Sequence, residues 1–269
     1  MNFHVYLPPV NSRQNGLAPV LYFLSGLTCT DENFVQKAGA FRALAHNGLA
    51  LVACDTSPRG DDVADDETAW DSGKGAGFYV DATQEPWSKH YKMYSYVVSE
   101  LPSVLKVLID ERSQEFGALD LSRAGIFGHS MGGHGALTIY LKNREKYRSV
   151  SAFAPISNPC HAECSWGQKN LGRYLGTENK EVEWPKYCAV DLVNQLNGQG
   201  SGIEIYVDQG TEDSFLKKGE LRVDELKEAC EKNGVTLVLN MREGYGHAYW
   251  FVQTFVQDHI EYHAQRLKQ

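Results

Sequence analysis

The pentapeptide Gly128-His129-Ser130-Met131-Gly132 is the segment of this chain with the clearest capacity for chemistry. It follows the apolar run Ala124–Phe127 and precedes a stretch of small residues. A serine hydroxyl is a poor nucleophile, so it has to be exposed, oriented and deprotonated by a neighbouring base. A G-x-S-x-G pattern between a strand and a helix provides the exposure, because the flanking glycines permit a sharp turn with the serine at its tip. The context therefore predicts Ser130 as a nucleophile rather than as part of an ordinary glycine-rich turn.

A nucleophilic serine of this kind requires an acid and then a histidine later in the chain. Three acids follow the apolar run Ile203–Val207 and compete for the role: Asp208, Glu212 and Asp213. Asp208 stands at the end of the run, where a carboxylate can instead brace the turn. Asp213 is favoured, because it lies beyond Gly210 on the loop from which an acid reaches across.

His247 is the predicted general base among the nine histidines. It follows the apolar run Thr236–Asn240 and precedes a helical pattern that begins near Trp250. Its task is to accept the Ser130 proton and return it to the leaving group. His129 and His134 lie too close to the serine in sequence for that task, and we expect them to support the site from behind.

Two backbone N–H groups are candidates for stabilising a developing oxyanion. One belongs to Met131, because the turn aims the N-terminus of the following helix at the reacting carbonyl. The other belongs to Leu27, in the segment Ser25-Gly26-Leu27-Thr28-Cys29 after the apolar run Val20–Leu24. A plain turn after a strand is the alternative interpretation of that segment. Cys29 lies two residues further on, and we expect a semi-buried bystander near the acyl site rather than a second nucleophile.

The elements that position these residues alternate along the whole chain, and this alternation predicts an α/β fold. The expected strands are Phe3–Leu7, Val20–Leu24, Leu49–Cys54, Ala124–Phe127, Ser149–Phe153, Ile203–Val207 and Thr236–Asn240. The expected helices are Phe41–His46, Ser95–Glu115, Gly133–Asn143, Ser214–Asn233 and Trp250–Leu267. Together with Ser130 they predict an α/β-hydrolase fold, with a mostly parallel central sheet and helices on both faces. We expect one domain over residues 1–269, with residues 155–197 as an irregular excursion over the carboxyl edge of the sheet.

The composition of the chain argues against several classes of binding partner. The formal net charge of −8 disfavours a nucleic-acid partner or an anionic membrane surface. No apolar stretch is long enough to span a membrane, and the N-terminus lacks the pattern of a secretory signal. The six cysteines are scattered, which favours free thiols in the cytoplasm. Cys160, His161 and Cys164 have a loosely metal-like spacing, but no second half-site follows, so we expect neither a metal nor another cofactor.

Several longer segments resemble the S-formylglutathione hydrolase family, also called esterase D. They are Val5–Pro9, Leu24–Thr30, Gly75–Thr83, Met93–Val97, Gly128–Ala136 and Asp208–Asp213. The resemblance covers essentially the whole chain. It implies hydrolysis of S-formylglutathione to glutathione and formate in formaldehyde detoxification. It also implies a triad of Ser130, Asp213 and His247, with Leu27 and Met131 as oxyanion donors.

The resemblance, together with an exposed strand Phe3–Leu7, further implies a homodimer. The sequence departs from the family pattern at three places. The N-terminal strands of the family are expected to be missing, Gly246 and Ala248 flank the histidine where the family has Asp and Ser, and Ser72 replaces an aromatic residue. Cys29 and Trp70 are expected near the substrate, although a tryptophan is more often a packing residue.

Two other functions compete with this interpretation. One is a general short-chain carboxylesterase, for which S-formylglutathione is incidental. The other is a catalytically silent binding protein, because a fold alone does not confer activity. The presence of all three triad residues argues against the silent protein.

Overall fold

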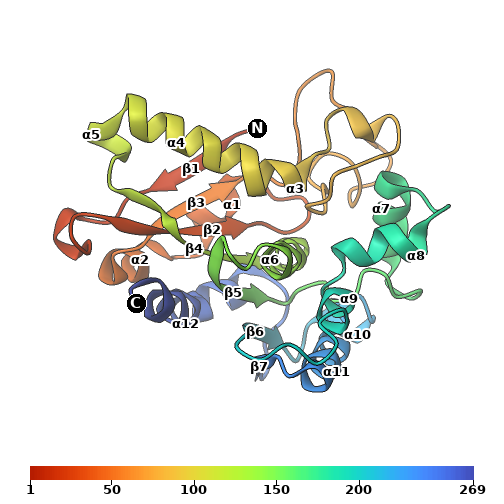
Figure 1. Cartoon of the computed structure of the whole chain (residues 1–269). Coiled ribbons are helices and arrows are strands. Elements are labelled where there is room, and N and C mark those ends of the chain that lie inside the picture. The colour runs from red at the N-terminus through yellow and green to blue at the C-terminus, as the bar shows by residue number, and fades with distance from the viewer.

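The computed structural model describes residues 1–269, and a seven-stranded sheet runs through its middle (Figure 1). The strand order is β1-β3-β2-β4-β5-β6-β7, with β1 antiparallel to β3 and all other neighbours parallel. All seven expected strands are present, and so is the expected mostly parallel sheet. The strands are β1 (Phe3–Tyr6), β2 (Ala18–Leu24), β3 (Ala50–Cys54), β4 (Leu119–His129), β5 (Tyr147–Phe153), β6 (Glu204–Gly210) and β7 (Thr236–Arg242).

The central strands are covered on both faces, which explains their sequences. Every residue of β2 and β3 is buried, and both strands read as continuous apolar runs rather than as alternating patterns. Because the strands are parallel, their carboxyl ends meet at one edge of the sheet. Leu24 of β2 lies opposite Gly128 of β4, and Phe153 of β5 lies opposite both His129 and Asp208. The loops that carry the predicted site residues all leave from this edge.

Helices pack on opposite faces of the sheet through alternate residues of β4. On one face, α6 (Met131–Lys142) packs against β2, β4 and β5, and Gly128 lies directly against the backbone of this helix. On the other face, α12 (Tyr249–Leu267) packs against β4 and β5, with the ring of Phe127 5.6 Å from that of His263. This face also carries α1 (Glu32–Lys37) and α2 (Phe41–Asn47).

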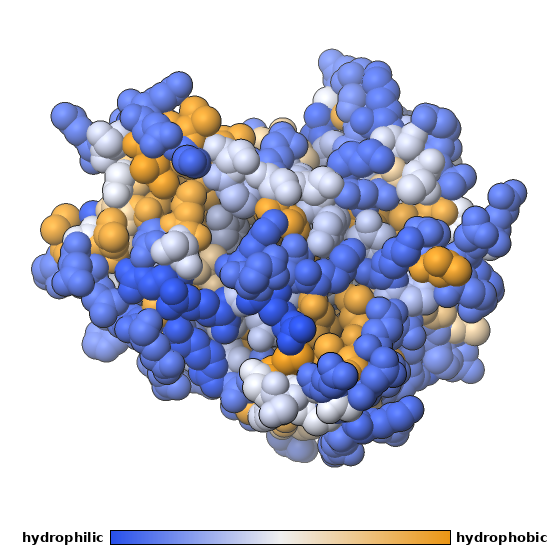
Figure 2. All heavy atoms as spheres, viewed as in Figure 1, coloured by the Kyte–Doolittle hydropathy of each residue, from blue (hydrophilic) through white to orange (hydrophobic).

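The expected helix Ser95–Glu115 is present as a series of turns with different windings. It comprises α3 (Met93–Ser95), a π-helical turn η3 (Tyr96–Glu100), α4 (Leu101–Glu111) and α5 (Ser113–Phe116). Pro102 has no N–H, so it removes a bond to the carbonyl of Val98, which accepts from Lys146 Nζ at 3.5 Å instead. Apolar side chains are exposed along α4, among them Val107, and Figure 2 shows an apolar patch over this helix on an otherwise mostly hydrophilic face.

Two sequence predictions in the C-terminal half are wrong. Ser214–Asn233 is not one helix but two, α10 (Ser214–Lys217) and α11 (Val223–Asn233). The chain between them turns inward, with Gly219 and Arg222 at positive φ, so that the carbonyl of Leu221 accepts a hydrogen bond from the Ser157 N–H. A straight helix could not make this contact.

The sequence predicted an irregular excursion over the carboxyl edge of the sheet. In the structure this segment is largely helical. It contains α7 (Ser165–Leu175), α8 (Lys180–Glu183), the 3₁₀ turn η4 (Trp184–Tyr187) and α9 (Ala189–Asn194). The buried residues Leu171, Tyr174 and Leu175 follow helical spacing, a signal that the many Gly, Asn and Cys residues obscured. Short 3₁₀ turns also occur at η1 (Val10–Ser12) and η2 (Trp87–Lys89). No helix has the length and apolar character needed to cross a bilayer.

Candidate active site

Ser130 stands on a strained turn between β4 and α6. Its φ is 57° and its ψ is −119°, a conformation that a non-glycine residue adopts only when the surroundings enforce it. The Ser130 N–H donates to the Phe153 carbonyl at 2.9 Å, and its own carbonyl accepts from the N–H of His134 at 3.0 Å. The flanking glycines are required for close approach. A Cβ on Gly128 would lie 2.2 Å from the Gly132 carbonyl oxygen, and one on Gly132 would lie 1.9 Å from that of Leu24.

The loops after β6 and β7 bring Asp213 and His247 together. Oδ2 of Asp213 lies 2.6 Å from Nδ1 of His247, and the carboxylate is fully buried. Its other oxygen accepts the N–H of Phe215 at 2.8 Å, and Gln209 Nε2 donates to Oδ2 at 3.3 Å. Burial acts to raise the pKa of Asp213, but the hydrogen bond and charge of His247 and the other donors outweigh it and lower that pKa. A carboxylate held ionised in this way fixes the orientation of the His247 ring.

The two other candidate acids serve different contacts. Asp208 is buried and accepts from Arg242 Nε at 2.7 Å and from Asn240 Nδ2 at 2.8 Å, so it links β6 to β7. Glu212 is exposed and pairs with Lys217. Neither carboxylate contacts His247, so among the three only Asp213 has the geometry of the predicted acid.

Ser130 and His247 line the same pocket, which has a volume of about 250 Å³. The His247 side chain is 16% exposed, which leaves it accessible from this pocket. No hydrogen bond joins the Ser130 hydroxyl to His247 in the structure. Such contacts are often long without substrate and tighten in the reacting complex.

His129 packs beside His247, with ring centroids 4.6 Å apart. Burial first, and the neighbouring His247 second, lower the pKa of His129 to about 3. His129 therefore stays neutral, so it places no second positive charge beside His247 when that ring is protonated. His134 is also buried and contacts the Phe78 carbonyl through Nε2 at 3.0 Å. His134 thus lies behind the site, as the sequence predicted, whereas His129 lies beside His247 and also lines the pocket.

The Leu27 and Met131 N–H groups donate to no acceptor within the chain. Met131 is the first residue of α6, where a helix leaves its N–H groups unpaired. The Leu27 loop is held in place from both sides. The Thr28 N–H donates to the Gly75 carbonyl at 2.9 Å, and the Tyr79 hydroxyl donates to the Ser25 carbonyl at 2.9 Å.

Cys29 and Trp70, the two residues expected near the substrate, both line this pocket. Cys29 is buried, and this burial raises the pKa of its thiol despite the nearby charge of Lys37. Trp70 is 62% exposed, and its ring stands edge-on to that of Trp166 at 6.1 Å. An exposed indole at a pocket rim is available to a ligand.

Sequence reasoning missed three aromatic residues of the pocket: Trp166, Phe215 and Tyr249. Phe215 and Tyr249 each lie two residues after a predicted triad residue, so their proximity was open to inference from position alone. Trp166 comes from α7, within the excursion that was expected over this edge. None of the residues lining this pocket belongs to the cluster of metal-ligating side chains found elsewhere in the fold.

The chain is similar to known proteins over its whole length. Residues 1–262 match the sequence model of the Esterase family. The chain is 50% identical to an S-formylglutathione hydrolase of Arabidopsis thaliana over all of this chain and 89% of that protein. It is 48% identical to an S-formylglutathione hydrolase of Mus musculus over 99% of this chain and 89% of the mouse protein. A solved S-formylglutathione hydrolase structure from Agrobacterium tumefaciens superposes with a TM-score of 0.87 and 47% identity, covering 98% of this chain and 89% of that one.

Proposed function

The chain belongs to the S-formylglutathione hydrolase family, an α/β-hydrolase-fold group of esterases, and from this premise we propose that it hydrolyses S-formylglutathione to glutathione and formate. The observation that carries the proposal is the Asp213–His247 contact at the rim of the pocket that contains Ser130. The protein is an enzyme, and the proposed catalytic triad is Ser130, His247 and Asp213.

The reaction begins with attack of the Ser130 hydroxyl oxygen on the formyl carbonyl. His247 accepts the hydroxyl proton, and Asp213 stabilises the imidazolium that forms. The oxyanion of the tetrahedral intermediate accepts hydrogen bonds from the unpaired N–H groups of Leu27 and Met131. Collapse breaks the C–S bond, and glutathione leaves as a thiol with the proton from His247. Water then attacks the formyl ester on Ser130 while His247 takes one of its protons. The ester bond breaks, His247 returns this proton to the Ser130 oxygen, and formate leaves.

The pocket suits a small acyl group on a larger leaving group. The pocket encloses a volume of about 250 Å³ between aromatic side chains and Cys29. A formyl group is the smallest acyl group, so it takes up little of this space and leaves the rest to the leaving group. Trp70, exposed at the rim beside Trp166, is proposed to contact the glutathione part.

The experiment that tests this function compares two substrates. The proposal expects kcat/KM for S-formylglutathione to exceed that for p-nitrophenyl acetate by orders of magnitude. A preference for p-nitrophenyl acetate would instead identify a general short-chain carboxylesterase. A protein that fails to react with a fluorophosphonate, while Ser130 is intact and the chain is folded, would be a silent binding protein.

We propose further that the chain forms a single domain over residues 1–269, works in the cytoplasm and assembles as a homodimer. All six cysteines are free, which suits a reducing compartment. The outer edges of β1 and β7 are unpaired within the chain, and an unpaired edge is a surface for association. Light scattering at micromolar concentration tests the dimer, and a monomer would contradict it.

A further inference from the structure

Two cysteines and an aspartate of the excursion meet outside the substrate pocket. The Sγ atoms of Cys160 and Cys188 and a carboxylate oxygen of Asp191 all lie within 4.8 Å of one another. Cys160 comes from the loop between β5 and α7. Cys188 is the N-cap of α9, and Asp191 lies in the first turn of that helix. The three ligand atoms therefore tie a loop to a helix that begins much later in the chain.

The group differs from the one that the sequence spacing suggested. The Cys164 thiol donates to the Glu220 carbonyl at 3.5 Å and so is occupied elsewhere. His161 Nε2 faces Glu225, 3.8 Å from its carboxylate. Neither belongs to the group around Cys160. In the folded chain, Cys160 is therefore grouped with Cys188 and Asp191 and not with its sequence neighbours His161 and Cys164.

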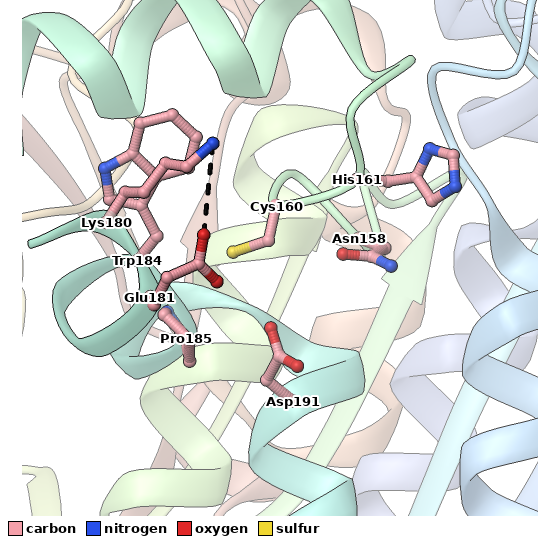
Figure 3. A pocket seen from close by; sticks show the side chains of 8 residues that line it. All are labelled: Asn158, Cys160, His161, Lys180, Glu181, Trp184, Pro185 and Asp191. Atoms are coloured by element: carbon pink, nitrogen blue, oxygen red, sulfur yellow. Dashed lines mark ion pairs between the residues drawn. The ribbon is translucent and has the colours of Figure 1, made fainter. Parts of the chain in front are cut away.

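The cluster is accessible from solvent through its own pocket. This pocket has a volume of about 260 Å³ and is lined by Asn158, Cys160, His161, Lys180, Glu181, Trp184, Pro185 and Asp191. Figure 3 shows the side chains of Cys160 and Asp191 pointing into it. Cys188 is fully buried behind them. The pocket provides an entry path and a place for a water molecule.

The donor atoms and their spacing fit a zinc-class cation. With Zn–S bonds of about 2.3 Å and tetrahedral angles, two thiolates on one Zn²⁺ stand about 3.8 Å apart. Ligand atoms within 4.8 Å of one another reach that arrangement by shifts of about 1 Å. Mg²⁺ and Ca²⁺ prefer shells made of oxygen alone, so two sulfur donors disfavour them. We propose that Cys160, Cys188 and Asp191 bind one Zn²⁺, with the fourth position open to water in the pocket.

Binding has a defined proton balance. Each thiol gives up one proton to solvent as its sulfur bonds to the cation, so two protons leave for each Zn²⁺ bound. The Cys188 thiol then loses its hydrogen bond to Asn158 Oδ1, which is 3.2 Å long. Two thiolates and one carboxylate exceed the charge of the cation by one. In the same pocket the charge of Lys180 is paired with that of Glu181, 3.9 Å away, so the occupied site keeps this excess negative charge.

The site stabilises the fold rather than taking part in turnover. None of the three ligands lines the substrate pocket. The loop that carries Cys160 begins beside the nucleophile, where the Ile156 N–H donates to the Ser130 carbonyl at 3.3 Å. It is joined to α9 by a bond from the Val190 N–H to the Ser157 carbonyl at 3.4 Å. A cation that bridges the same two segments raises the melting temperature and leaves kcat unchanged.

Titration of the reduced full-length protein with Co²⁺ tests the proposal, because thiolate ligation produces a charge-transfer band in the near ultraviolet. We expect one equivalent to bind, Zn²⁺ to displace it, and two protons to be released. Cys160 is half-buried, so Cys160→Ser is the variant least disruptive to folding. It and Asp191→Asn should weaken binding by more than about 100-fold, beyond the loss of a residue that only orients a ligand.

Two matched controls separate this site from its surroundings. Glu181→Gln changes a carboxylate that lines the same pocket but is outside the group, and Cys164→Ser changes a thiol of the same segment. Both should retain the band and the Zn²⁺-dependent rise in melting temperature. No band in the reduced wild type overturns the proposal. So does a band that survives Cys160→Ser and disappears in Cys29→Ser, which would place the cation in the substrate pocket.

Discussion

Replacing Asp213 by asparagine tests the proposed triad most directly, because the surrounding donors decide how the amide orients. Oδ1 of Asp213 accepts the Phe215 N–H at 2.8 Å and the Leu216 N–H at 3.4 Å. An asparagine keeps its oxygen toward these backbone donors, so its NH₂ group faces His247. The amide then donates to Nδ1, and the His247 proton moves to Nε2.

A histidine that carries its proton on Nε2 cannot accept the proton of Ser130. The expected loss in kcat for Asp213→Asn is about 10⁴-fold, the effect of a wrong tautomer in such a triad. This equals about 5 kcal/mol of transition-state stabilisation at 1.36 kcal/mol for each tenfold change. KM should change little, because Asp213 is buried and does not line the substrate pocket.

The matched control is Asp208→Asn, the same change at the competing acid. It removes the charge partner of Arg242 and should destabilise the fold by about 3 kcal/mol, the lower end for a broken buried pair, since Arg242 keeps its contact with Asp258 at 2.8 Å. The kcat of the folded fraction should stay near that of wild type. Steady-state kinetics with S-formylglutathione and urea denaturation measure both variants. A large loss of kcat in Asp208→Asn, with Asp213→Asn nearly active, would refute the assignment.

Three further outcomes are expected. Ser130→Ala should lower kcat by about 10⁶-fold and abolish fluorophosphonate labelling with an unchanged circular dichroism spectrum; residual labelling would point to another nucleophile. Cys29→Ser should stay active and resist N-ethylmaleimide, which should inactivate wild type slowly and more slowly with substrate; equal inactivation of both would identify a different thiol. Unfolding free energy should fall between pH 7 and pH 5 by about 2 kcal/mol in total for each histidine held neutral in the fold, because the unfolded chain binds more protons below its histidine pKa of about 6.5. Burial lowers the pKa of His129 to about 3 and that of His134 to about 4, and it also lowers the pKa values of His259 and His263. Equal stability at pH 7 and pH 5 would contradict this expectation.

The local sequence pattern was enough to predict the sheet, which the structure contains, and a candidate nucleophile. The seven apolar runs became seven strands, and the central ones among them, such as β2 and β3, are continuously apolar because a parallel strand buried on both faces needs such a sequence. The turn at Ser130 was also predictable from the sequence. Neighbouring backbone atoms lie so close to Gly128 and Gly132 that a Cβ atom at either position would clash with them. Loops that leave the carboxyl ends of parallel strands share one edge, so the chain order Ser, Asp, His was sufficient to predict a shared site.

The points at which helices begin and end were harder to predict, because contacts with residues far away in the sequence determine them. Ser214–Asn233 has an acceptable helical pattern, yet a hydrogen bond between Ser157 and Leu221 breaks it in two. In the excursion, the buried stripe of α7 was hidden by glycine and asparagine, whose low helix propensity is offset by packing over the sheet edge.

From the sequence alone, residue type and short-range spacing determined what kind of chemistry this protein carries and which serine and histidine are its best candidates. The tertiary structure decided which partners those residues have. Asp208 and Asp213 are equivalent in type and nearly so in position, but the register of β6 and β7 commits Asp208 to Arg242 and leaves Asp213 for His247. Cys160 likewise meets Cys188 rather than Cys164, because α9 packs back against the loop after β5. Side-chain contacts depend on distances between segments far apart in sequence, and only the packed fold determines those distances.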